Sequence, residues 1–235
     1  MIESDAADPI LEEQTRYYRV RDLNPDDWFY RRGTYDHGPT RNRDWFRDAV
    51  ELMQALSGFN PKGHVLEIGG GTGLWTRQLV LTADHVTVVD VSERSLALNR
   101  IRLGSLASRV RYVERDIFSW PAGERFDAIF SPFFLSHVPR HRFEQFWEFL
   151  DSILVPGGRI FWVDTTRSQT ALGQNGRLPD RGSIITRRRT GDREYRVYKV
   201  YYTPESLAHQ VGALGWVADV ASTQEFFLYG SARRK

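Results

Sequence analysis

Residues 67–73 constrain this 235-residue chain more than any other segment, because they place four glycines between a short apolar strand and a helix. The strand is predicted over residues 64–68 and the helix over residues 74–81. Glycine lets the backbone turn tightly and approach a ligand with no Cβ in the way. The first turn of a helix also leaves backbone N–H groups available to that ligand. The segment therefore predicts a nucleotide-binding turn after a strand.

This turn has three other interpretations. A tight strand-to-helix turn needs glycine even when it binds nothing. NAD and FAD sites follow the spacing G-x-G-x-x-G, whereas Gly69, Gly71 and Gly73 follow G-x-G-x-G and Leu74 stands at the third fingerprint position. A phosphate-binding loop ends in Lys followed by Ser or Thr, and that pair does not follow these glycines.

Strands and helices alternate through the middle of the chain, which predicts βαβ units and a parallel sheet. The strands are almost continuously apolar, as expected for a sheet covered on both faces. Beyond residue 195 we expect two more strands, paired antiparallel at the edge of the sheet, with a helix between them. The predicted strands cover residues 64–68, 86–90, 110–113, 126–130, 159–164, 195–201 and 226–232, and the main helices cover residues 41–56, 74–81, 142–154 and 204–214.

Acidic side chains follow the second and third strands. Asp90 lies 21 residues after Gly69, where a carboxylate can accept both hydroxyls of a ribose. Asp116 follows the third strand and can accept from an adenine amino group. Residues 130–134 follow the fourth strand and reach the same crevice, because ligands of such sheets bind outside the carboxyl ends of the strands.

Composition narrows the function further. The 32 basic and 30 acidic residues give a net charge of +2, which calls for no nucleic acid partner. The absence of cysteine excludes disulfides and thiol nucleophiles, and we expect no metal site, since Pro139 interrupts any helix between His137 and His141. With neither a signal peptide nor a membrane-length apolar run, we expect a cytoplasmic protein, a monomer or homodimer, that acts on a small molecule without binding a membrane.

Five motifs follow one another along the chain, at residues 65–73, 88–90, 115–117, 126–129 and 154–158. In this order, over about residues 45–165, they resemble the motifs of the class I S-adenosylmethionine-dependent methyltransferases. The resemblance implies an α/β, Rossmann-like methyltransferase fold, with a mostly parallel seven-stranded sheet, helices on both faces and an antiparallel edge strand. It implies S-adenosylmethionine as cofactor and S-adenosylhomocysteine as product. The cofactor contacts that it implies are Glu67, Gly69, Gly71, Gly73, Trp75, Asp90, Val91, Asp116, Ile117, Ser131 and Phe133.

Residues 17–21, 135–139 and 195–200 also resemble segments of the dehydrophos phosphonate O-methyltransferase group. The chain departs from that group at Pro25, where a tyrosine is usual, and at Phe133-Phe134, where a His-Trp pair is usual. Methyltransferases diverge in substrate while keeping their fold. The resemblance therefore suggests a phosphonate acceptor without fixing it.

The domain organisation follows from where aromatic and charged residues gather. Residues 1–15 are polar and expected to fray, while residues 16–40 hold too many aromatics to leave in water. We expect residues 1–40 to form a lid or substrate segment, in which Tyr30 and Tyr35 bind substrate or simply pack. Residues 41–235 would form a single methyltransferase domain, with a substrate-contacting insert at about residues 166–202.

Methyl transfer from a sulfonium is an in-line displacement, so the protein mainly has to align a nucleophile and exclude water. His137 follows the fourth strand and could act as catalytic base or steer an anionic oxygen, or else only bond to backbone. Arg187, Arg188 and Lys199 would hold an anionic acceptor, unless they belong to a charged hairpin in solvent. We expect O-methylation of an acidic (phosphonate or carboxylate) or hydroxylated metabolite. The alternatives are methylation of a neutral phenol or amine, an NAD-dependent oxidoreductase and a non-catalytic nucleotide-binding module.

Overall fold

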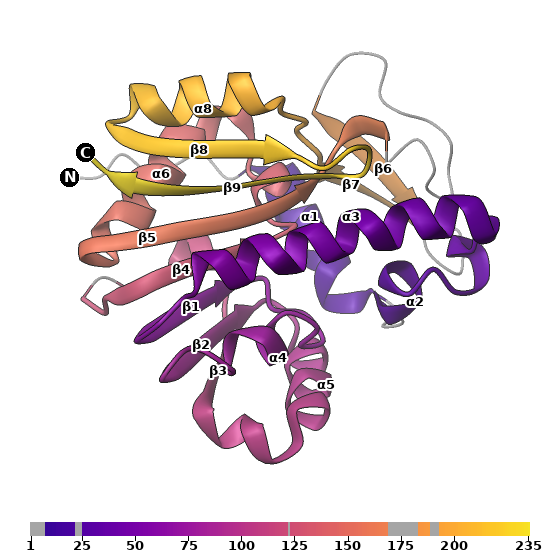
Figure 1. Cartoon of the computed structure of the whole chain (residues 1–235), viewed down its shortest axis with the longest axis horizontal. Coiled ribbons are helices and arrows are strands. Elements are labelled where there is room, and N and C mark those ends of the chain that lie inside the picture. Colours follow the sequence, from indigo (N-terminus) through magenta and orange to yellow (C-terminus); the bar gives the residue numbers. More distant parts are fainter. Residues whose placement is uncertain (1–7, 22–24, 122, 169–182, 189–192) are drawn as a thin grey trace.

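The computed structural model describes residues 8–21, 25–121, 123–168, 183–188 and 193–235, and within these ranges a seven-stranded sheet organises the molecule (Figure 1). The strands, in spatial order, are β3 (Val110–Glu114), β2 (His85–Asp90), β1 (His64–Ile68), β4 (Phe126–Pro132), β5 (Leu154–Thr165), β9 (Phe227–Arg234) and β8 (Trp216–Ser222). The first five pair in parallel, and β9 runs antiparallel to both of its neighbours. The Rossmann-like methyltransferase fold is therefore confirmed. The antiparallel strand β9 lies one place in from the edge, which β8 occupies.

Helices cover both faces of the sheet. Because neighbouring strand residues point to opposite faces, Val65 packs on one side and Leu66 on the other. The first face is covered by α3 (Gly38–Phe59), α4 (Thr76–Leu79) and α5 (Glu93–Leu103), and the second by α6 (Phe143–Ser152) and α8 (Pro204–Ala213) (Figure 1).

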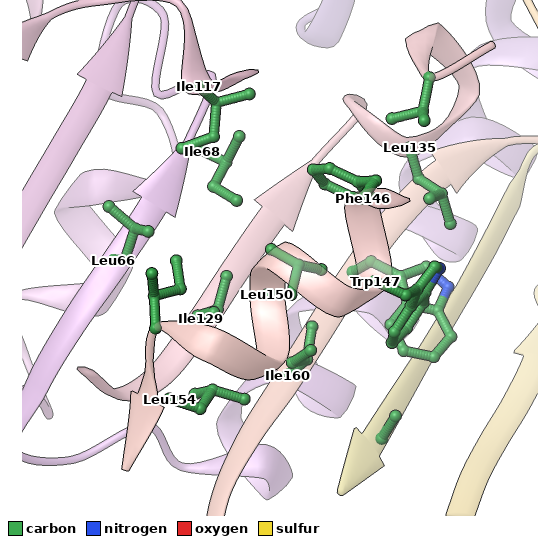
Figure 2. Packing of buried hydrophobic residues seen from close by; sticks show 14 of the residues in the cluster. Leu66, Ile68, Ile117, Ile129, Leu135, Phe146, Trp147, Leu150, Leu154 and Ile160 are labelled. Atoms are coloured by element: carbon green, nitrogen blue, oxygen red, sulfur yellow. The ribbon is translucent and has the colours of Figure 1, made fainter. Parts of the chain in front are cut away.

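The second face shows how this packing works. Figure 2 shows Leu66, Ile129 and Ile160 of the sheet facing Trp147 and Leu150 of α6. All five side chains are fully or almost fully buried. At about 1.5–3 kcal/mol for each large apolar side chain, this burial fixes the helix on the sheet.

Two further layers close over the carboxyl ends of the parallel strands. One is the amino-terminal pair of helices, α1 (Pro9–Val20) and α2 (Pro25–Phe29). The other is a hairpin of β6 (Ile184–Arg188) and β7 (Glu194–Tyr198), in which Arg187 pairs with Tyr195. Residues 169–182 and 189–192 of the expected insert lie outside the described part of the chain. The division at residue 40 stays a prediction.

Three sequence-based expectations were wrong. The strand predicted at residues 195–201 pairs with β6 in a sheet of its own, so the last strand pairs with β8 instead, which the sequence pattern missed. Local alternation predicts a strand but does not encode its partner. The helix expected over residues 74–81 spans only α4. Residues 9–15, expected to fray, belong to α1, whose amino end is capped by Asp8.

Candidate functional site

A cavity of about 380 Å³ lies at the carboxyl ends of β1 and β4. The strand order reverses between these two strands, because β2 and β3 continue to one side and β5 to the other. Open α/β sheets bind their ligands in the crevice at this switch point. The cavity walls come from the glycine turn, the ends of β2 and β4, α1, α2 and the β6–β7 hairpin.

The glycine turn has two kinds of position. Gly69 and Gly71 line the cavity, and both have positive φ, 73° and 51°. A Cβ added to Gly71 would meet no atom within 4 Å, so the backbone there is open toward a ligand. A Cβ on Gly70 would lie 2.2 Å from Val88, and one on Gly73 would lie 2.6 Å from Asn99. Gly69 and Gly71 therefore face the space for a ligand, whereas Gly70 and Gly73 allow the turn to pack closely on the core beneath it.

Asp90 ties the turn to the end of β2. One carboxylate oxygen accepts the Gly71 N–H at 2.9 Å, and the other accepts the Ser92 N–H at 2.9 Å. Burial raises the pKa of Asp90, although both amides oppose that shift. Each oxygen keeps a further lone pair, as binding a ribose diol requires. The open backbone at Gly71 and this carboxylate fit the adenosyl part of S-adenosylmethionine.

The other predicted cofactor residues divide into two groups. Asp116 caps the short helix η3 (Ile117–Ser119) by accepting the Phe118 N–H, and it still faces the cavity. The residues that line the cavity are Gly69, Gly71, Trp75, Asp90, Val91, Asp116, Ile117 and Phe133. Glu67, Gly73 and Ser131 lie behind the wall. Their cofactor contacts stay a prediction.

Glu67 is fully buried under the glycine turn. Its Oε2 accepts the hydroxyl of Thr76, which in turn accepts an N–H of Asn99 at 2.7 Å. Burial raises the pKa of Glu67 to about 8, and the Thr76 hydrogen bond only partly offsets this. The carboxyl is therefore neutral at pH 7 when no charged ligand group is near.

The cavity has a polar end, lined by Thr165, Arg187 and Lys199, and the partners of Lys199 are Ser136 and Asp164, which do not line the cavity. Lys199 Nζ donates to Asp164 Oδ1 at 3.0 Å and to Ser136 Oγ at 2.7 Å. Burial alone would raise the pKa of Asp164, but the Lys199 ammonium lowers it on balance. Burial also lowers the pKa of Lys199, and the neighbouring Asp164 opposes that shift. Asp164 thus balances the buried lysine, and Arg187 leaves the polar end with a net positive charge.

The predicted substrate residues are not all gathered there. Arg187, Lys199, His137 and Tyr35 line the cavity. Tyr30 is 42% exposed and does not line it, and the side chain of Arg188 lies outside the described part of the chain. A substrate role for each of them stays a prediction.

His137 lies in η4 (Leu135–His137), directly after β4. Its Nδ1 lies 2.6 Å from the carbonyl oxygen of Tyr198, and its Nε2 lies 2.8 Å from the hydroxyl of Tyr18. Burial and the nearby Lys199 charge lower the pKa of His137 to about 3. Both ring nitrogens are therefore engaged, which favours a positioning role over that of a general base.

Sequence reasoning expected a lid or substrate segment at residues 1–40 but missed the helix α1 within it. Leu11, Gln14, Thr15, Tyr17 and Tyr18 all line the cavity from this helix. The missed signal was an Asp-Pro pair at residues 8–9, which is a helix start with an N-cap and a proline at N1. The sequence predicted that the aromatics of residues 16–40 pack, but not their partners: Trp28 lies 5.0 Å from Phe133, ring centre to ring centre, and Phe29 lies 6.1 Å from Trp75.

Neither a metal site nor a membrane span is found in the described residues. These residues contain no cluster of three or more His, Cys, Asp or Glu side chains arranged to hold a metal ion. Within the same ranges, every helix is too short or too polar to cross a membrane.

Comparison with known proteins places these features in a family. A family model described as a methyltransferase domain matches residues 65–158. The ubiquinone/menaquinone biosynthesis C-methyltransferase UbiE of Azotobacter vinelandii is 33% identical over 137 residues, which are 56% of this chain and 52% of UbiE. The chain spans about half the length of the curated relatives it matches. The N-methyltransferase NodS of Bradyrhizobium japonicum, 20% identical with a TM-score of 0.56 over 80% of this chain and 96% of NodS, shares the fold.

Two solved structures match along nearly the whole chain. DhpI in complex with SAH is 30% identical with a TM-score of 0.76, covering 96% of this chain and 97% of DhpI. DhpI in complex with SAM and HEP is 32% identical with a TM-score of 0.77, covering 97% and 100%. The chain therefore belongs to the class I S-adenosylmethionine-dependent methyltransferases, with S-adenosylmethionine as cofactor and S-adenosylhomocysteine as product.

Proposed function

We propose that this protein methylates an oxygen of a small acidic metabolite, a phosphonate or a carboxylate. The observation that carries the proposal is the polar end of the cavity, where Lys199 and Arg187 face the same space as the glycine turn. A buried site with a net positive charge needs an anion to offset the cost of desolvation. The solved complex of the relative DhpI contains HEP together with SAM, which supports a site that holds a second ligand beside the cofactor.

Each part of the cavity has a role in this proposal. Gly69, Gly71 and Asp90 would hold the cofactor, which supplies a methyl group already activated on a sulfonium. Arg187 and Lys199 would bind the anionic oxygens of the acceptor and align one of them with that methyl, because charge-assisted hydrogen bonds fix orientation.

The remaining walls would keep water out, and the reaction would need no group to take up a proton. The aromatic wall, formed by Trp28, Phe29, Trp75 and Phe133, presents no charge to the reacting atoms and excludes solvent. An anionic oxygen needs no general base, so a neutral His137 is compatible with turnover.

The acceptor profile of Arg187→Ala tests the proposal. The wild-type protein is first given labelled S-adenosylmethionine and a panel of phosphonates, carboxylates, phenols and amines. We expect Arg187→Ala to lower kcat/KM for acidic acceptors by roughly 10- to 100-fold, the range of a hydrogen bond to a charged group, and to leave neutral acceptors unchanged. Equal losses on both classes would contradict the proposal.

Lys199 needs a different design, because Lys199→Met alone would strand the buried Asp164 carboxylate. The matched variant is the double change Lys199→Met with Asp164→Asn, which removes both charges. It should keep the fold and still lose activity on acids. A double variant with wild-type activity on acids would show that Lys199 is only structural.

Methylation of a neutral aromatic acceptor is the second candidate, and the aromatic wall favours it. Aromatic rings stack on or edge against such walls with about 0.5–1.5 kcal/mol beyond simple burial. A wild-type preference for phenols over every acid in the same panel would select this function. Turnover on any acceptor would remove a non-catalytic binding module from consideration.

A further inference from the structure

We propose that the hydroxyl oxygen of Tyr18 accepts a hydrogen bond from the substrate and that His137 holds it in this role, so that the site selects acids that still carry an O–H or N–H group. The proposal rests on the proposed function and names the chemical class of the acceptor more closely. Tyr18 belongs to α1 and was not among the site residues expected from the sequence. It lines the cavity together with Arg187 and Lys199.

The direction of each hydrogen bond follows from the partners of the imidazole. The Tyr198 carbonyl can only accept, so the His137 Nδ1 that lies 2.6 Å away must carry the proton. Burial keeps the ring neutral by lowering the pKa of His137. Nε2 is therefore an acceptor, and the Tyr18 hydroxyl, at 2.8 Å, must donate its only proton to it.

This arrangement leaves the Tyr18 oxygen with lone pairs and no proton to offer the cavity. Burial raises the pKa of Tyr18, so the group stays a phenol. Gln14 holds the pair in place: its side chain donates to the His137 carbonyl at 3.1 Å and accepts the Tyr198 N–H at 2.9 Å. The rings of Tyr18 and His137 also meet edge to face at 5.3 Å.

The polar groups around the cavity then divide into hydrogen-bond donors and an acceptor. Arg187 and Lys199 offer donors, which suit anionic oxygens, and Tyr18 offers an acceptor, which suits a proton on the same ligand. A phosphonate with one negative charge has both an anionic oxygen and a hydroxyl. A fully ionised acid with no other O–H or N–H would offer the Tyr18 oxygen no donor, which costs affinity.

A matched pair of tetrahedral anions tests this division. The probes are ethylphosphonate and ethanesulfonate, titrated calorimetrically into the full-length protein saturated with S-adenosylhomocysteine. The pH is set below the second ionisation of the phosphonate, so that both anions carry one charge and only the phosphonate keeps a hydroxyl. We expect the wild type to bind the phosphonate about three- to tenfold more tightly, as one neutral hydrogen bond allows.

The variant Tyr18→Phe should lower the affinity for the phosphonate to that for the sulfonate and leave the affinity for the sulfonate unchanged. Arg187→Ala is the control, and it should lower the affinity for both anions. If Tyr18→Phe lowers the affinity for both anions equally, or for neither, the inference is overturned while the proposed function stands. Failure of the wild type to bind either anion would overturn both.

His137 has a readout that a purely structural role would not move. In His137→Met the Tyr18 proton loses its acceptor and can turn toward the cavity. The sulfonate should then bind more tightly than in the wild type, and the preference for the phosphonate should disappear. An unchanged preference in a variant with wild-type affinity for S-adenosylhomocysteine would show that His137 does not set the direction of the Tyr18 hydroxyl.

Discussion

The short turn at the end of β1 has to leave room for a ligand and also pack closely against the core, and different glycines meet these two needs. Gly71 leaves room for a ligand, because a side chain there would point into the cavity. Gly70 and Gly73 leave no such room, because their hydrogens already face Val88 and Asn99. Asp90 both accepts the Gly71 N–H, which fixes the turn, and lines the cavity.

Asp90→Ala should lower the affinity for S-adenosylhomocysteine by roughly 10- to 100-fold, because a charged acceptor is lost. Gly71→Val should abolish binding, since valine is strained at a φ of 51° and would also enter the cavity. Calorimetric titration measures both effects, and the melting temperature of Asp90→Ala serves as control for folding. Unchanged affinity in both variants would contradict the placement of the cofactor.

Glu67 predicts a pH dependence of stability. Burial raises its pKa from 4.5 to about 8, so the folded chain keeps a proton that the unfolded chain loses. A raised pKa adds stability that is complete below pH 4.5 and is lost as the pH rises through about 8. In Glu67→Gln, the free energy of unfolding in urea should fall less than in the wild type over that range. Parallel pH curves for the two proteins would contradict a buried neutral carboxyl.

Among the elements, α1 shows most clearly what the sequence hides. Asp8 and Pro9 announce its start, but its inner face holds Gln14 and Thr15 as well as apolar side chains. Such a helix is also fixed by hydrogen bonds between Gln14 and distant backbone, which no local pattern of side chains encodes. The parallel strands were predictable because burial on both faces makes them apolar throughout. The partners of β7 and β9 were not, because pairing depends on distant residues.

Gln14→Leu should loosen α1 from β7. The change leaves the Tyr198 N–H and the His137 carbonyl buried without their partner, at a cost of about 1–3 kcal/mol each. Hydrogen exchange of residues 9–20 should accelerate in this variant. Glu13→Gln is the matched control, because the neighbouring Glu13–Arg196 pair is exposed and contributes little. Equal exchange in Gln14→Leu and the wild type would contradict the anchoring role.

At the scale of the whole molecule, one buried carboxylate joins helix α3 to the turn between β8 and β9. Asp48 of α3 accepts the Thr223 hydroxyl at 2.7 Å and the amides of Glu225 and Phe226 at 2.9 and 3.0 Å. Burial alone would raise the pKa of Asp48, but these donors lower it. Sequence patterns could place α3 and β9, but they could not show that a single acid links them.

Asp48→Ala should lower the free energy of unfolding by about 2–5 kcal/mol, because three buried donors lose their acceptor. Asp44→Ala, at an exposed ion pair on the same helix, should change it by less than about 1 kcal/mol. Because the pKa of Asp48 is depressed, its contribution is present above its unfolded pKa and is lost as the pH falls through the folded one. Urea denaturation measures all three effects, and equal stability of the two variants would contradict the link.

The most direct test of the central claim follows the methyl group itself. The wild-type protein is incubated with S-adenosylmethionine labelled in the methyl group and with matched acidic and neutral acceptors, and the labelled product is compared with synthetic standards. We predict that the label appears in the methyl ester of a phosphonate or carboxylate. Label found only in methylated phenols, amines or carbon centres would contradict an acidic oxygen acceptor.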